Sequence, residues 1–441
     1  MSKIKMPTTD EVAGMWQASG LKEKLLFTFA MIAIFRFGVQ IPIFGIDNAE
    51  LLTSGKMGDL VGFLDIFTGG ALGKVSIFAL GIGPYITASI IMQLLAAAVP
   101  ALEKLQKEEG EAGRRKLSQY TRYFTVILSV FQSTVFLTYL SKMGMLSPDG
   151  IPALNFIGSI LTLTAGTMFI MWLAELITEN GIGNGASILI FIGIISRIPS
   201  YFGATGQLVG GNTGMAFGLV LLIAIFLATL VLIVIMQEAM RKVVIVNARR
   251  QVGNKVYGGV NTHIPFKLNP GGVMPIIFAV AILLFPTTIL SLLSKGNMPE
   301  TLKNIIDFIS NDLLSGYSYY IIYFLLIVGL TFFYASIMPN MQPKEIANNL
   351  KKYGSSIPGI KPGKPTADAL DKILSRVTFI GALGLGIIAL VPGIATQATH
   401  ITPLQGLGST SLIIMVGVAL DFINQIKTHL LARQYEGFLK Q

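Results

Sequence analysis

The sequence contains no cysteine, only three histidines and few charged residues for its length. Without cysteine the chain has no disulfide, no thiolate nucleophile and no cysteine-ligated metal. Charged residues make up 13% of the 441 residues, whereas a soluble protein carries about 25%. The low charge predicts a chain whose surface lies largely in lipid.

Motifs that carry catalysis are also missing. The stretches LGKV at Leu72 and PGKP at Pro362 lack the spacing and the hydroxyl residue of a phosphate-binding loop. The histidines, His263, His400 and His429, are scattered along the chain and form no paired-histidine motif. The sequence therefore predicts no enzyme activity, no cofactor and no metal site, so that any energy must come from a partner.

Apolar runs near the ~20 residues that cross a bilayer dominate the chain. They predict an all-α polytopic membrane protein with ten transmembrane helices. The first run is too long for the core of a signal peptide and shows no cleavage site, so we interpret it as a retained span. The runs cover residues 25–43, 75–99, 121–141, 154–177, 184–202, 214–236, 272–293, 317–338, 377–396 and 408–430.

Lys and Arg gather on one side of these spans, which the positive-inside rule assigns to the cytoplasm together with both termini. The predicted organisation is a tail over 1–24, a first half over 25–200, an external connection over 201–213, a second half over 214–430 and a tail over 431–441. Five spans per half would invert the second half relative to the first. The outward segments hold only Lys56, Lys74, Lys142, Arg197, Lys295 and Lys303.

Few ionisable residues interrupt the spans. Arg36 and Asp421 lie well inside theirs, while Glu175 and His400 lie near span ends. Carriers coupled to protons or ions need such groups at the bilayer midplane, so their scarcity argues against that class. For Arg36 and Asp421 the simplest interpretation is a structural pair or a snorkelled end.

A short amphipathic stretch precedes the second span. At ~1.5 Å per residue such a helix reaches only about half the bilayer, so it must lie inside the protein or line a cavity. We interpret it as a re-entrant stopper, with a helix lying flat on the outer leaflet as the alternative. Four apolar residues at helical spacing and a closing glycine pair define it: Leu60, Phe63, Leu64, Phe67, Gly69 and Gly70.

The start of the second span has two features of interest. Pro84 removes a hydrogen bond to Leu80 and is expected to kink the helix. Ile82 and Ile86 lie one turn apart and share a face. If that face lines a passage, its branched alkyl groups exclude water and ions by dewetting. Ordinary packing or lipid contact is the alternative for both isoleucines.

Two long basic connections, 237–271 and 339–373, are predicted on the cytoplasmic side. In the first, VVIV and KVYGGV flank Gly253 and Asn254, which suggests a hairpin. In the second, KEIANNLKKYG reads as a helix and GIKPGKP as a stiff turn. Protruding cationic loops of this length suit RNA phosphates, whose binding is salt-dependent, or an acidic motor surface.

Long ordered blocks from about Leu21 to Glu436 resemble the SecY/Sec61-alpha family of protein-conducting channel subunits. They include RFGVQIPIFGID at Arg36, TGGALGKVSIFALGIGPYITASIIMQLL at Thr68 and NNLKKYGSSIPGIKPGKPTADALDKI at Asn348. The resemblance implies two pseudo-symmetric five-helix halves around an hourglass pore. It also implies a bacterial plasma membrane, or a thylakoid membrane in a cyanobacterium or plastid.

The resemblance implies roles for individual residues. Ala186 stands where the family often has a larger aliphatic residue. Lys361 stands where the family usually has Arg, and lysine keeps the charge but lacks the planar bidentate fork of arginine. The implied pore ring is Ile82, Ile86, Ala186, Ile190, Ile277 and Ile414, and the implied plug is about 60–70. The lateral gate between the second and seventh spans would include Gln93, Gln132, Ser133, Phe285 and Pro286. The loops for the ribosome and the motor would use Arg241, Lys242, Arg249, Arg250, Lys255, Lys267, Lys351, Lys352, Lys361 and Lys364.

The function that follows is a passive channel for unfolded secretory polypeptides, which also releases apolar segments sideways into the bilayer. The implied partners are signal sequences, small SecE- and SecG-like membrane subunits, the motor ATPase SecA and the ribosome. Two rival classes remain open from the residues alone. One is a secondary transporter for a small solute, and the other is a membrane scaffold with no pore.

Overall fold

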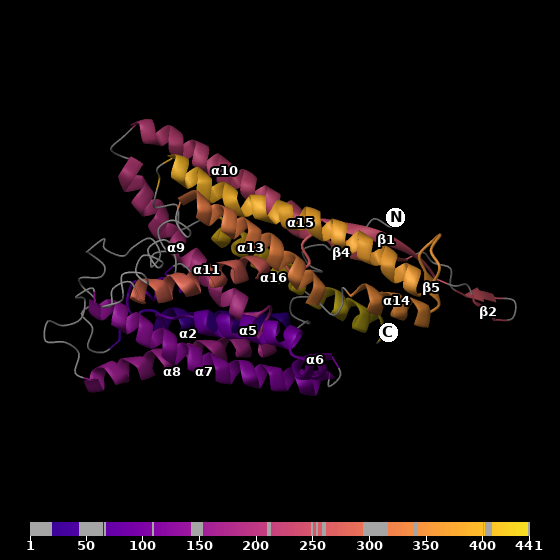
Figure 1. The fold of residues 1–441 in the computed structure, drawn as a ribbon, viewed down its shortest axis with the longest axis horizontal. Helices are drawn as coiled ribbons and strands as arrows, with labels where there is room; N and C mark the ends of the chain where they lie inside the picture. The colour runs from indigo at the N-terminus through magenta and orange to yellow at the C-terminus, as the bar shows by residue number, and fades with distance from the viewer. Residues whose placement is uncertain are drawn as a thin grey trace. The chain divides into compact units, whose positions relative to one another are not determined.

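The computed structural model describes residues 20–43, 65, 68–107, 110–142, 153–209, 213–247, 250–252, 255–257, 262–293, 316–337, 342–399, 401 and 408–439. The described chain is mostly helical (Figure 1). It forms two compact units, which are considered separately below. Unit 1 comprises Met1–Leu208 and Ile414–Gln441, and unit 2 comprises Val209–Ile413.

Each of the ten predicted apolar runs overlaps one helix. Within the described residues, six helices are long and apolar enough to cross a membrane, and α5 and α11 contribute shorter apolar stretches. These helices make the chain a polytopic membrane protein. The helices that the ten runs overlap are α2 (Leu21–Gly38), α5 (Gly83–Ala98), α7 (Gly110–Lys142), α8 (Ala153–Asn180), α9 (Gly185–Val209), α10 (Thr213–Glu238), α11 (Met274–Leu293), α13 (Gly316–Ile337), α15 (Lys364–Thr399) and α16 (Ser409–Leu439).

The core of unit 1 lies where α7 and α8 pack against the chain that precedes α5. Leu137 and Leu163 are fully buried there against Val75 and Ala79. Gly166 makes this approach possible, because a Cβ at that position would lie 2.0 Å from the carbonyl oxygen of Ile77. The segment before α5 is therefore embedded in unit 1.

The start of α5 corrects the expectation of a kink at Pro84. The chain from Thr68 to Ile82 forms a series of turns, and the helix begins only at Gly83. Pro84 therefore lies in the first helical turn, where a backbone N–H has no intrahelical acceptor to lose. The proline starts the helix and does not bend it.

The end of the last helix packs in unit 1. The chain from Ile414 onwards groups with that unit. Phe422, Ile426 and Leu430 of α16 pack against a buried cluster that includes Leu21 and Ile182. Apolar contact with the first helix thus assigns the end of α16 to unit 1.

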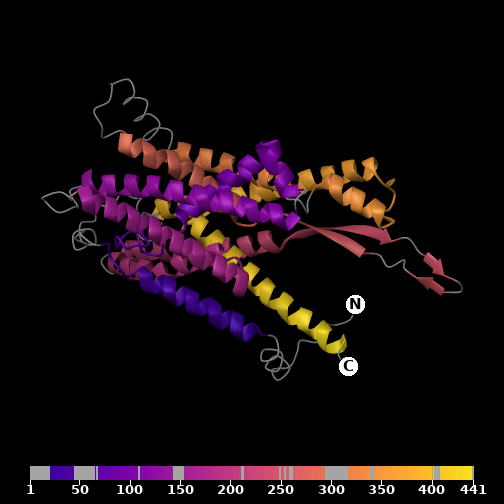
Figure 2. The same cartoon turned by 90° about the horizontal axis from the view of Figure 1, so that it is seen from below.

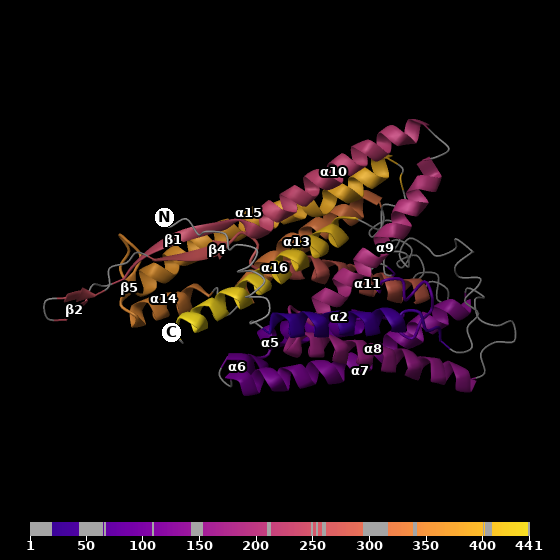
Figure 3. The same ribbon diagram turned by 180° about the vertical axis from the view of Figure 1, so that it is seen from behind.

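Unit 2 combines apolar helices with a small sheet. Helix α15 packs against α10 and α13, and α11 packs against α13 (Figure 3). The antiparallel strands β1 (Met240–Asn247) and β4 (Thr262–Lys267) run side by side (Figure 2). The short strand β5 (Ser355–Ser356) pairs with the other edge of β1, giving the order β4-β1-β5.

The hairpin predicted across Gly253 is present, with different strands. β2 (Arg250–Val252) pairs with β3 (Lys255–Tyr257) in antiparallel register, and Val252 lies opposite Lys255. The VVIV stretch instead lies in β1 and pairs with β4. Its partner strand THIPFK is short and mixed in polarity, which hides it from a search for alternating apolar residues.

Candidate functional site

Residues 68–82 of unit 1 form a folded strap between the predicted stopper and α5. The strap is tied to the chain after α2, because Ile43 N donates to Val75 O at 3.0 Å and Ile77 N donates to Ile41 O at 3.0 Å. Gly69 and Gly70 have φ of 67° and 91°, a left-handed conformation that favours glycine. The strap is thus held in place by backbone bonds.

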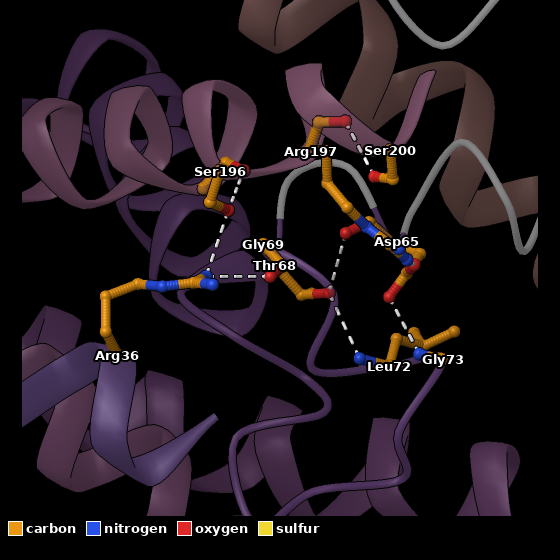
Figure 4. A network of polar contacts seen from close by, with 10 residues as sticks. Arg36, Asp65, Thr68, Gly69, Leu72, Gly73, Ser196, Arg197 and Ser200 are labelled. Atoms are coloured by element: carbon orange, nitrogen blue, oxygen red, sulfur yellow. Dashed lines mark hydrogen bonds and ion pairs between the residues drawn. The ribbon is translucent and has the colours of Figure 1, made fainter. Parts of the chain in front are cut away.

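Asp65 belongs to a network of polar contacts at the start of the strap (Figure 4). Its Oδ1 accepts a hydrogen bond from the backbone N–H of Gly73 at 2.7 Å, and its Oδ2 pairs with Arg197 Nη2 of α9. Thr68 Oγ1 donates to the carbonyl of Asp65 and accepts from Leu72 N. The Asp65 side chain is 5% exposed, so its negative charge is buried beside a cation.

Arg36 of α2 contacts the same strap from another helix. Its Nη1 donates to the carbonyl oxygen of Gly69 and to Ser196 Oγ of α9, both at 2.9 Å. Ser196 Oγ in turn donates to Gly193 O at 2.7 Å. A Cβ on Gly69 would lie 2.9 Å from the Cα of Gly193. Two arginines from two helices therefore converge on Asp65 and Gly69.

Sequence reasoning missed this network. Arg197 falls inside the predicted span 184–202, but no partner was predicted for it; the structure places it within α9 with a side chain that is 30% exposed. Asp65 did not stand out at all. The available signal was one acid and one base embedded in otherwise apolar helical stretches, since intramembrane charges usually pair with one another.

The residues predicted for the pore ring occupy helix starts and buried positions. Ile82 and Ile86 flank the first turn of α5, where Ile86 N donates to Ile82 O, and Ala186 and Ile190 lie one turn apart on α9. Four members of the predicted ring are buried: Ile82, Ile190, Ile277 and Ile414. Ile86 and Ala186 are partly exposed.

The residues predicted for the lateral gate lie in α5, α7 and α11. Gln93 Nε2 donates to Ser89 Oγ at 3.1 Å within α5. Gln132 is half-buried in α7, and the neighbouring Ser133 is fully buried. No described residue hydrogen-bonds the hydroxyl of Ser133. Phe285 and Pro286 lie in α11.

The four apolar residues of the predicted stopper, Leu60, Phe63, Leu64 and Phe67, lie outside the described residues. Gly69 and Gly70 are described, and they lie at the start of the strap, where Gly70 N donates to Asp65 O at 3.0 Å. The structure therefore describes the base of that element. The interpretation of the element itself stays a prediction.

The two basic connections form one structure in unit 2, here called the platform and comprising β1, β4, β5, α14 (Pro343–Lys352) and the start of α15. The predicted helix KEIANNLKKYG is confirmed as α14. Side chains from both connections share one apolar core: Val243, Phe266, Ile357, Leu370 and Leu374. Pairing of β5 with β1 and the hydrogen bond from Ser355 Oγ to Asn247 Oδ1 join them further.

The cations of the platform point into solvent. The exposed ones are Arg241, Lys242, Lys267, Lys351, Lys352, Lys361 and Lys364. The turn that carries Lys361 is fixed by Thr366, whose Oγ1 donates to the Lys361 carbonyl at 2.8 Å. Arg250 and Lys255 lie in the β2–β3 hairpin, and Arg249 lies outside the described residues. Figure 1 shows β2 at the far tip of this region.

Comparison with known proteins gives a consistent result. The SecY family model matches residues 76–423. The chain is 44% identical to the protein translocase subunit SecY of Synechococcus elongatus, covering 100% of this chain and 99% of the relative. It is 45% identical to that of Synechocystis with the same coverage, and 42% identical to that of Thermotoga maritima, covering 97% and 98%.

Solved structures share the fold at low identity. One is a SecY protein whose plug domain is described as stabilising the closed state of the translocation channel and maintaining a membrane seal. It has a TM-score of 0.64 and 18% identity, over 93% of this chain and 92% of that one. Another is Sec61 in a canine ribosome-channel complex, with a TM-score of 0.59 and 18% identity over the same shares.

Proposed function

Because the chain belongs to the SecY family, we propose that it works as a passive, gated channel for unfolded polypeptides. It is the protein-conducting subunit of a Sec translocase and is not an enzyme. The observation that carries this function is the 44% identity to a translocase subunit along the full length of the chain. The apolar spans and the lack of catalytic motifs agree with it.

The proposed waist of the channel is a ring of aliphatic side chains from several helices. Branched alkyl groups offer no hydrogen bond to water, so a narrow ring of them dewets and blocks ions while remaining able to part. The smaller Ala186 makes this ring wider or leaves room for a neighbour. The ring members are Ile82, Ile86, Ala186, Ile190, Ile277 and Ile414.

The stopper over about 60–70 is proposed to seal the idle channel. A related SecY protein has a plug domain with that role. In this chain two described residues of the element, Asp65 and Gly69, are held by polar contacts with Arg197 and Arg36. Such anchoring fits a segment that occupies a defined position at rest.

We further propose that a signal sequence opens the channel sideways between α5 and α11. Its apolar core is about 7–15 residues long. Apolar segments then leave into lipid, because each central Leu or Ile is favourable there by ~0.5 kcal/mol while a central charge opposes by ~3 kcal/mol. The polar residues Gln93, Gln132 and Ser133 suit a seam that must part, since polar contacts between membrane helices contribute only ~0.6 kcal/mol on average.

The platform is the proposed docking surface for the ribosome and for SecA. Its exposed cations suit phosphates of ribosomal RNA, and related Sec61 has been solved in a ribosome-channel complex. Small SecE- and SecG-like membrane subunits complete the proposed assembly. Both termini are proposed to be cytoplasmic.

Reconstitution tests the function directly. Vesicles containing the chain with its small membrane partners receive SecA, ATP and an unfolded secretory precursor. The proposal predicts that the precursor becomes protected from added protease only when all components are present. A complex that moves a small solute but never protects the precursor would support the rival transporter.

A further inference from the structure

The buried ion pair between Asp65 and Arg197 has a specific place in unit 1. Asp65 lies at the base of the proposed stopper, and Arg197 lies in α9, twelve residues after its first residue Gly185. At ~1.5 Å per residue this is about 18 Å along the helix, far from its start. A charge within an apolar span is costly unless it is paired, so each member depends on the other.

The two carboxylate oxygens of Asp65 have different partners. One carboxylate oxygen pairs with Arg197, and the other accepts a hydrogen bond from the Gly73 N–H. The carboxylate therefore forms an ion pair and also holds the strap through a backbone hydrogen bond. Arg36 adds a second hold through the Gly69 carbonyl. Figure 4 shows the two arginines reaching the strap from different helices.

We propose that Asp65 and Arg197 form a latch that holds the base of the stopper against α9 in the idle channel and separates when the channel opens. Arg197 is thus a positioning residue for the seal. The proposal rests on the stopper role stated above. Separation leaves two charges without their partner in an apolar span, which favours return of the segment once the polypeptide has passed.

The test measures resting ion conductance in planar bilayers, using the complex with its small membrane partners. Asp65→Asn keeps an oxygen for the Gly73 N–H and removes only the charge. Arg197→Gln removes the charge from the other side. Each is expected to raise the resting leak by about tenfold, because a buried charge loses its partner. Each should also pass precursors that carry defective signal sequences.

A double-mutant comparison separates a latch from two unrelated defects. If the residues act as a pair, the variant with both changes leaks no more than either single variant. Two effects that multiply, or single variants that leak like the parent, would overturn the latch. If the Asp65→Asn protein fails to accumulate, the leaks of Arg197→Gln and of the charge-preserving Asp65→Glu are compared instead. Asp65→Glu is expected to seal better than Arg197→Gln, and equal leaks would count against the pair.

Two matched controls and one deletion complete the design. Lys74→Gln removes a partly buried cation of the same strap, whose Nζ donates to Gln40 Oε1 and not to the Asp65 network, and Glu175→Gln breaks the Arg122–Glu175 ion pair between α7 and α8. Neither should raise the leak. Deletion of residues 60–68 tests the stopper itself. If the deletion variant shows no rise in resting ion conductance, the stopper proposal is wrong. If the deletion raises the conductance but the point variants do not, only the latch proposal is wrong.

Discussion

Val246 of β1 lies opposite Ser356 of β5 in antiparallel register, which joins two connections that are more than 100 residues apart in the sequence. The apolar side of the same sheet buries Phe266 against Leu370 of α15. The platform therefore folds as one body. Its exposed cations hold fixed positions relative to one another.

We predict that Phe266→Ala loosens the whole platform. The side chain is 2% exposed, and truncating a buried Phe costs about 3–5 kcal/mol. We expect faster cleavage of both connections in limited proteolysis and weaker co-sedimentation with ribosomes. Val244→Ala on the exposed face of β1 is the control. Proteolysis confined to the connection that carries Phe266 would contradict a shared core.

The charge on the platform should act through phosphate contacts. Changing both Arg241 and Lys242 to Gln is expected to weaken ribosome binding and to lower the salt slope by about two, one per lost contact. Lys104→Gln in α6 (Pro100–Lys107) removes a cation from another exposed position and should leave the slope unchanged. An unaltered slope in the double variant would exclude these two residues from the contact.

Gly166 and Gly158 of α8 form a matched pair for testing the strap. A Cβ at Gly166 would meet the Ile77 carbonyl at 2.0 Å, whereas one at Gly158 meets nothing within 4 Å. Gly166→Ala should therefore lower the thermal stability of the purified complex and raise its resting leak. Gly158→Ala should behave like the parent, and equal behaviour of the two variants would contradict the close packing of α8 on the strap.

The waist should depend on its apolar character. Ile86→Asn or Ile277→Asn adds a hydrogen-bonding group and is expected to let precursors with defective signal sequences through. Ile235→Asn, at a 59% exposed position of α10, serves as the control. Export of such precursors at the parent's rate in both waist variants would remove these residues from the ring.

The sequence predicted the helices well because bilayer thickness sets a length that apolar runs must match. All ten runs overlap helices, and α14 was found from its sequence. Local patterns failed where distant contacts decide the outcome. Pro84 starts α5 because the strap before it is held by Ile41 and Ile43, which no local pattern of the second span reveals.

In the candidate site, too, the sequence indicated some residues and not others. Apolar candidates such as Ile82 and Ile190 could be named from the family blocks, and both are buried. The polar partners could not be found this way, because pairing of Asp65 with Arg197 joins residues that are far apart in the chain. The predicted span 184–202 already contained Arg197, but its sequence alone does not show which acid, if any, pairs with it.

The most direct measurement follows a polypeptide through the channel. The parent chain has no cysteine, so a single cysteine at position 82 or 277 gives a unique attachment point for a thiol crosslinker. A secretory chain stalled in transit should crosslink to both positions and not to a cysteine at the exposed position 235. Crosslinks at 235 alone, or at none of the three, would contradict a protein-conducting waist lined by these isoleucines.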